Sequence, residues 1–206
     1  TVIEFVTVAA EFCAFLERAE SMKRSTFVDT TLKILPLLYL KASMLPKCEM
    51  IGDESPETYV TEEIYEVLRI NLASILAEKD DYLEVFLPDM AYSDEPIKKN
   101  ISEDLADIYQ DIKDFIFVFQ LGLNETMNDS LAICQENFGL LWGQKLVNTM
   151  RALHDVKYSP KARGEDEEEE EYEPENNEDC HCEDDDCHCH DHGCHCHDAV
   201  SYTHLT

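Results

Sequence analysis

Apolar side chains recur at helical spacing through almost all of the first 158 residues. In each of five stretches they return every three or four positions and leave the opposite side polar, which is the pattern of an amphipathic helix. We predict helices over residues 2–19, 25–45, 61–77, 102–121 and 126–154. Because only another helix covers such an apolar face, the sequence predicts an all-α fold, an up-and-down bundle of about five helices.

Polar residues and one proline mark where these helices begin and bend. Serine and threonine side chains accept hydrogen bonds from the free N–H groups of a first helical turn. We expect this role for Ser25 or Thr26, for Thr61 and for Ser102. Pro36 lacks the N–H that a helix interior needs, so it predicts a kink or a local break.

Two further features concern how the helices are joined and packed. Residues 82–87 are the one stretch with strand-like content, short enough to be a linker that lies extended across the bundle. Gly139 and Gly143 are about one turn apart in the last predicted helix, so we expect another helix to approach closely there. Trp142 lies on the apolar stripe of that helix and is expected to anchor the core.

Beyond residue 164 the apolar pattern ends and a Cys-His-Cys unit appears three times at a strict seven-residue period. Thiolate and imidazole are the side chains that hold transition metals well. The twelve donors suffice for about three four-coordinate ions, and we expect Zn, with Cu(I) or Ni as alternatives. The predicted metal ligands are Cys180, His181, Cys182, Cys187, His188, Cys189, His190, His192, Cys194, His195, Cys196 and His197.

The repeat has a second interpretation. A strict period is also what a duplicated stretch of DNA produces, and an acidic low-complexity arm adds charge without binding metal. The dozen residues that usually separate the ligand pairs of a zinc finger are absent, so we do not expect a small folded zinc domain. A flexible chelating arm, unstructured until metal binds, fits the composition better.

The chain is strongly acidic. Residues 165–206 contain seventeen Asp and Glu but no Lys or Arg, and they carry −17 of the formal net charge of −29. Such a field repels phosphate backbones and anionic lipids and attracts cations and basic protein surfaces. We expect metal ions and a protein with a basic surface as partners, and neither nucleic acid nor membrane.

The remaining cysteines, Cys13, Cys48 and Cys134, are too scattered to form a disulfide framework. Because a reduced Cys/His cluster is typical of the cytosol, we expect a cytoplasmic protein. We divide the chain into a helical bundle domain (1–158), an acidic disordered linker (159–179), the metal-binding repeat (180–198) and residues 199–206, which resemble translated sequencing adapter.

Three stretches carry a resemblance to a known family: Ser102-Glu-Asp-Leu-Ala-Asp-Ile-Tyr-Gln-Asp111, Trp142-Gly-Gln-Lys-Leu146 through Arg151-Ala-Leu-His154, and Leu37-Leu-Tyr-Leu40. In these the chain resembles the bacterial, all-helical family catalogued as domain of unknown function 5063. The resemblance implies a bundle over most of residues 1–158, and it implies no activity. It does not extend to the Cys/His tail. The matching motif positions are Asp104, Asp107, Tyr109, Asp111, Trp142 and His154.

The most suggestive group in the bundle is a row of carboxylates, Asp104, Asp107, Asp111 and Asp114, whose spacing places them on one helix face. Like charges at this spacing destabilise an isolated helix by a few tenths of a kcal/mol per pair, so we expect solvent or cations to surround the row. Water is the ordinary answer, and we expect a solvated face. The alternatives are ion pairs with Arg69, Lys145 or Arg151, or a metal or catalytic site, which the absence of a Glu-x-x-His pair disfavours.

An enzyme would need Asp107 and Asp111 to converge with His154 or Glu136 in a concave pocket. For His154, near a helix end, a favourable interaction with the helix dipole is a better explanation than a catalytic role. We expect Tyr109 to be buried, with its hydroxyl bonded to a neighbouring helix. The sequence contains no nucleotide-binding glycine loop and no nucleophile elbow. We therefore expect a non-enzymatic protein.

The sequence thus predicts a helical protein that binds transition metal through its tail, in metal buffering, delivery or sensing, with the bundle as a docking module. The alternative is an acidic protein-interaction module whose tail only contributes charge.

Overall fold

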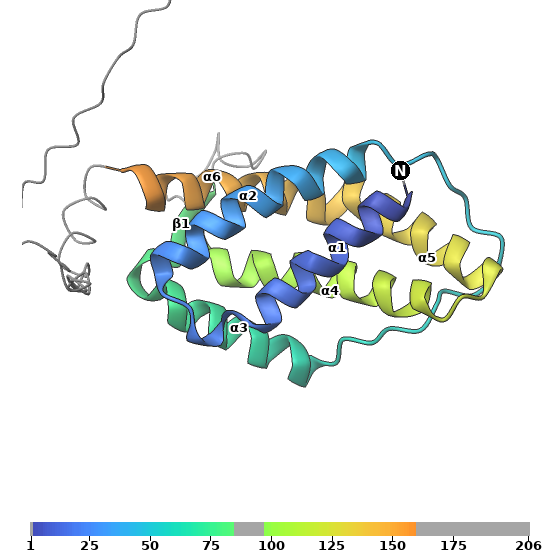
Figure 1. Cartoon of the computed structure of the whole chain (residues 1–206), viewed down its shortest axis with the longest axis horizontal. Coiled ribbons are helices and arrows are strands. Elements are labelled where there is room, and N and C mark those ends of the chain that lie inside the picture. The colour runs from blue at the N-terminus through green and yellow to red at the C-terminus, as the bar shows by residue number, and fades with distance from the viewer. Residues whose placement is uncertain (1, 85–96, 160–206) are drawn as a thin grey trace, which may run out of the picture. The chain divides into compact units, whose positions relative to one another are not determined.

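The structure, a computed structural model, describes residues 2–84 and 97–159, which form a helical bundle with one small sheet (Figure 1). The helices are α1 (Val2–Glu17), α2 (Arg24–Ser43), α3 (Glu62–Leu76), α4 (Ile101–Gln120), α5 (Asn124–Asn137) and α6 (Gly143–Tyr158). Short 3-10 turns follow α1 (Ala19–Ser21) and α3 (Ala77–Lys79), and a π-helical segment (Phe138–Trp142) joins α5 to α6.

Helices α1 to α4 alternate in direction, α5 runs back along α4, and α6 continues in the direction of α5 (Figure 1). This arrangement is the one expected for an up-and-down bundle. Helix α4 is central: it packs against α1, α3, α5 and α6, while α2 packs against α1 and α6. The core between them contains large side chains with no more than 1% of their surface exposed, among them Phe5, Phe12, Phe27, Leu35 and Trp142. The predicted helical bundle is therefore confirmed for the described residues.

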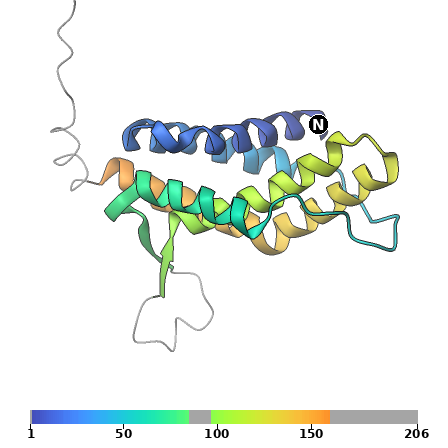
Figure 2. The ribbon, with the colours of Figure 1, turned by 90° about the horizontal axis from the view of Figure 1, so that it is seen from below.

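The all-α class was too narrow, because the described residues also contain a β-hairpin. Strand β1 (Asp81–Glu84) pairs antiparallel with β2 (Ile97–Asn100), with Asp81 opposite Asn100 and Glu84 opposite Ile97. Figure 2 shows that this hairpin projects from the bundle. Residues 81–84 are thus part of a sheet and not a free linker. The rest of the predicted extended stretch, residues 85–87, lies outside the described residues.

The ends of the helices agree only in part with the expected caps. Thr61 accepts a hydrogen bond from the N–H of Ile64 at 3.3 Å and begins α3 as predicted. Helix α2 begins at Arg24, so Ser25 and Thr26 lie inside its first turn and do not cap it. Helix α2 also continues through Pro36 without a break. Burial of Leu35 and Leu38 on either side outweighs the one hydrogen bond that the proline removes.

The last predicted helix, residues 126–154, is present and longer, since α5, the π-helical segment and α6 are continuous in sequence from Asn124 to Tyr158. The π turn shifts the register of the side chains. Trp142 is buried as expected, but its neighbours Leu140 and Leu141 are exposed.

The two glycines of this helix do not serve a close approach by another helix. The Gly143 N–H donates to the carbonyl of Phe138, five residues back, and a Cβ at Gly143 would lie 2.3 Å from that oxygen. Around Gly139 a Cβ would meet nothing within 4 Å. Gly143 is therefore required by the π turn of its own helix, and that turn is not visible as a sequence pattern.

None of the helices in residues 2–84 and 97–159 combines the length and apolar character that a membrane span requires.

Candidate functional site

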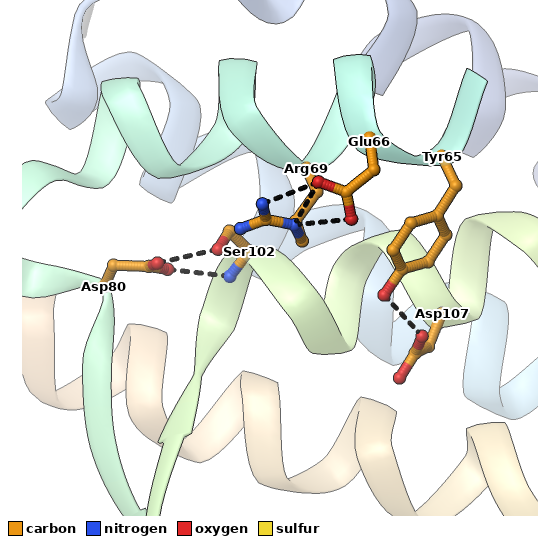
Figure 3. A network of polar contacts seen from close by, with 6 residues as sticks. All are labelled: Tyr65, Glu66, Arg69, Asp80, Ser102 and Asp107. Atoms are coloured by element: carbon orange, nitrogen blue, oxygen red, sulfur yellow. Dashed lines mark hydrogen bonds and ion pairs between the residues drawn. The ribbon is translucent and has the colours of Figure 1, made fainter. Parts of the chain in front are cut away.

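The four aspartates of the α4 row each meet a different part of the chain. Asp104 is 3% exposed and accepts a hydrogen bond from the hydroxyl of Tyr82 on β1. Its other oxygen, Oδ1, lies 3.8 Å from the ammonium of Lys145 on α6. One turn along α4, Asp107 accepts hydrogen bonds from Lys145 and, at 2.7 Å, from the Tyr65 hydroxyl of α3 (Figure 3). These two carboxylates therefore join α4 to the hairpin, to α3 and to α6.

The second half of the row fixes the other end of the bundle. Asp111 accepts a hydrogen bond of 2.6 Å from the side-chain amide of Asn137, the last residue of α5. Asp114 accepts two bonds of 2.7 Å from the backbone N–H groups of Tyr59 and Val60. The segment before α3 is thereby tied to α4.

The expectation of a solvated face was wrong for this row. Of the three cationic residues considered as ion-pair partners, Lys145 is the one that pairs with the row. Arg69 pairs instead with Glu66 of its own helix at 2.7 Å (Figure 3), and Arg151 is exposed. Sequence reasoning missed the hydroxyl, amide and backbone donors, because their proximity to α4 depends on the fold and not on spacing along the chain.

Burial and hydrogen bonding act in opposite directions on these carboxylates. Burial raises the pKa of Asp104, Asp111 and Asp114 above the ordinary value of 3.8, while the bonds from Tyr82, Asn137 and the backbone oppose the rise. For Asp104, the nearby Lys145 also opposes it.

The pKa of Lys145 is also raised, but for a lysine a raised pKa favours the charged form. Burial disfavours its charged form, but the hydrogen bond to Asp107 and the charges of Asp107, Asp104 and Glu103 outweigh burial and raise the pKa of Lys145. The pKa of Tyr65 is raised first by burial and then by its bond to Asp107, so its hydroxyl remains a donor. A lysine that keeps its proton acts as a cation here and not as a nucleophile.

The described residues do not assemble the catalytic pocket that an enzyme would need. A cavity of about 140 Å³ is lined by Asp111 and Asp114 with Cys134 and Asn137, and His154 is not among its lining residues. His154 is exposed, and its ring packs on that of Tyr158 with a centroid distance of 4.6 Å. Glu136 is also exposed. The convergence of Asp107 and Asp111 with His154 or Glu136, which the enzyme alternative requires, is therefore absent from the described residues.

Two other motif positions have the structural roles expected of them. Tyr109 is 2% exposed and donates its hydroxyl to Glu17 of α1 at 2.8 Å. Trp142 is 1% exposed, and its indole N–H donates to the carbonyl of Cys134 at 3.1 Å. Tyr109 therefore joins α4 to α1, and Trp142 anchors the core.

The predicted metal ligands, from Cys180 to His197, all lie outside the described residues. Within residues 2–84 and 97–159 no group of three or more His, Cys, Asp or Glu is arranged to hold a metal ion. Cys13 and Cys134 are buried free thiols, and burial raises the pKa of each. The partly buried Cys48 donates its thiol to the side-chain oxygen of Asn128 at 2.9 Å.

Comparison with known proteins agrees with the resemblance noted in the sequence. Residues 1–159 match the family described as "Domain of unknown function (DUF5063)". The chain belongs to this family. Its fold is shared with the crystal structure of protein BF1032 from Bacteroides fragilis, which is 92% identical in sequence with a TM-score of 0.71. That match covers 79% of this chain and 95% of BF1032. No curated protein matches the chain.

The DUF5063 match ends at residue 159, before the first cysteine of the Cys/His repeat. Neither the family description nor the name of BF1032 states an activity. The family thus accounts for the helical domain, and the chemistry of the tail is a separate matter.

Proposed function

We propose that this DUF5063 protein binds transition metal ions, with Zn as the preferred metal, through the Cys/His repeat at residues 180–197. The observation that carries the proposal is the threefold Cys-His-Cys unit at a seven-residue period. Thiolates favour Zn or Cu(I), and imidazoles accept Zn, Cu or Ni. Asp184, Asp185, Asp186 and Asp191 add a negative field that attracts cations to the same segment.

The helical domain supports the proposal by the way its own polar groups are used. The α4 carboxylates accept hydrogen bonds from α3, α5, α6, β1 and the segment before α3, so they hold the fold together. Two of the domain's three thiols are buried. We infer that the domain is a stable, non-enzymatic body that presents the tail. A stable domain joined to a chelating tail suits a role in metal buffering, delivery or sensing in the reducing cytoplasm.

The alternative is an acidic interaction module whose tail contributes only charge. The net charge of −29 favours it, since such a field attracts basic protein surfaces whether or not metal is present. It predicts that removing residues 165–206 leaves partner binding and cellular metal tolerance unchanged.

Native mass spectrometry of the reduced full chain with added Zn tests the proposal against this alternative. We expect about three bound ions, the number that twelve donors saturate at four-coordinate sites. A variant with all six tail cysteines replaced by serine should lose them, while the matched control Cys48→Ser, which changes a thiol of the domain, should not. Equal metal loading of all three proteins would support the alternative.

A further inference from the structure

A groove on the surface of the bundle is lined by apolar, acidic and amide side chains. It has a volume of about 340 Å³ and is formed by residues of α1, α3 and α4, which pack together in the bundle (Figure 1). Its lining includes the apolar Ile64, Val67 and Leu68 with the ring of Tyr109, and it also contains the carboxylates Glu17 and Glu63 and the amide of Asn71. We call it the α1–α3 groove.

The outer side of α3 leaves two aliphatic side chains exposed to water. Val67 is 56% exposed and Ile70 is 55% exposed. Residues three apart are neighbours on a helix surface, so these two side chains form one apolar strip, from Val67 in the groove lining to Ile70 outside it. An apolar strip that adjoins a groove marks a surface suited to burial by another molecule.

Two polar side chains of the groove, Tyr109 and Glu17, are paired with each other. The Tyr109 hydroxyl donates to Glu17 Oε1 at 2.8 Å, and Lys113 donates to the same oxygen at 2.6 Å. The side-chain amide of Asn71 also lines the groove. Ile64, Val67, Leu68 and the ring of Tyr109 supply the apolar part of the lining, which suits the apolar side chains of a partner.

The acidic groups, in contrast, keep capacity for a cation. No hydrogen bond or ion pair joins Glu17 Oε2 to any residue in the described part of the chain, and the same holds for the exposed Glu63. No lysine or arginine lines the groove. Lys113 offsets part of the charge of Glu17, which leaves Glu63 and one oxygen of Glu17 to face a partner.

We propose that the α1–α3 groove docks a basic amphipathic helix of a partner protein. Its apolar side chains pack on Ile64 and Val67, and its lysines or arginines pair with Glu17 and Glu63. Charge argues against occupants from this chain. A second copy would bring the same carboxylates against one another, and residues 165–198 are acidic without a single Lys or Arg. The proposal is independent of metal binding by the tail.

A synthetic Leu/Lys peptide of ~15 residues, with leucines at helical spacing, serves as the probe. Its affinity for the full chain is measured by fluorescence anisotropy at about 0.15 M salt. Val67→Lys should weaken binding by about ten-fold or more, because it removes an apolar contact and adds a like charge. The matched control Leu140→Lys makes the same charge change at a 71%-exposed residue that does not line the groove, and it should leave the affinity within about two-fold.

A second matched pair does not disturb any apolar side chain. Glu63→Lys should weaken binding, whereas Glu62→Lys, on the adjacent residue that does not line the groove, should weaken it less. Circular dichroism confirms that each variant is folded. Equal loss within both pairs would show that the peptide binds the overall acidic charge and not the groove, and absence of binding to the unmodified chain would overturn the proposal as well.

Discussion

The carboxylate of Asp80 accepts two hydrogen bonds from Ser102, one from its backbone N–H at 2.7 Å and one from its hydroxyl at 2.6 Å (Figure 3). Ser102 lies in the first turn of α4, where N–H groups have no partner within the helix. Asp80, just before β1, thus acts as the cap of a helix that begins after the hairpin. Ser102, which we expected to cap α4, instead donates its own N–H and hydroxyl to Asp80.

Asp80→Ala should lower the free energy of unfolding by about 2 kcal/mol, because it leaves a buried hydroxyl and a buried N–H without a partner. Urea unfolding measures the change. The control Asp81→Ala removes an exposed carboxylate that pairs with Lys98, and its effect should be clearly smaller. Equal losses would mean that the cap at Asp80 contributes nothing particular.

The two glycines of the last helix give opposite expectations for the same substitution. Gly143→Ala should destabilise the protein by roughly 1–3 kcal/mol, because the new Cβ would lie 2.3 Å from the Phe138 carbonyl. Gly139→Ala adds a methyl group in open space and should stabilise by about 0.5–1 kcal/mol, since alanine loses less backbone entropy. Thermal unfolding compares the two variants, and a Gly143→Ala protein as stable as the unmodified one would contradict the π-turn explanation.

Asp104 should make the protein less stable as pH rises. Burial raises the pKa of Asp104 in the folded state, so between 3.8 and that raised value the folded chain holds a proton that the unfolded chain has lost. Its contribution is fully present below 3.8 and is lost as pH rises through the folded-state pKa. Asp104→Asn keeps an acceptor for the Tyr82 hydroxyl and removes this titration. Relative to the unmodified protein, the variant should therefore gain stability with pH in urea unfolding over a pH series.

Asp29 provides the control of opposite sign. Hydrogen bonds from Lys157 and Lys33 lower the pKa of Asp29 to about 2, so its contribution is present above 3.8 and is lost as pH falls through about 2. Asp29→Asn should lose stability relative to the unmodified protein as pH rises over that range. If both variants had the same pH dependence, the assignment of opposite pKa directions would be wrong.

The link between Lys145 and Asp107 should appear as a coupling energy. A double-mutant cycle with Lys145→Gln and Asp107→Asn should give a coupling of about 1 kcal/mol, a value reduced because the Lys145 side chain is 34% exposed. The pair Arg69 and Glu66 on α3 serves as the comparison and should couple more weakly, because the carboxylate of Glu66 is 44% exposed and that of Asp107 is 27% exposed. A coupling near zero would show that Lys145 does not stabilise the α4 carboxylates through Asp107.

The helices were predictable because their signal is local. Apolar residues such as Leu105, Ile108 and Ile112 return at helical spacing, and the core of α4 follows directly from that period. Strand β2 was not predictable in the same way, since Ile97-Lys-Lys-Asn100 has a single apolar residue and no alternation. Its pairing with β1 is a long-range contact.

The same contrast explains the candidate site. The spacing of the α4 aspartates placed them on one face, but spacing does not show what lies opposite. The partners come from distant segments: Tyr82 meets Asp104 across 22 residues, and Val60 meets Asp114 across 54. The Cys/His repeat is the opposite case, because its chemistry is written in adjacent residues.

Metal binding by the Cys/His repeat is measured most directly by competitive titration of the reduced full chain with Zn, Cu(I) and Ni against chelators of known affinity. We expect tight binding of a defined number of ions, about three, with a preference for one metal. Replacing the six tail cysteines by serine should abolish this tight binding. Weak binding without preference among the metals, or tight binding that survives the six substitutions, would contradict the account.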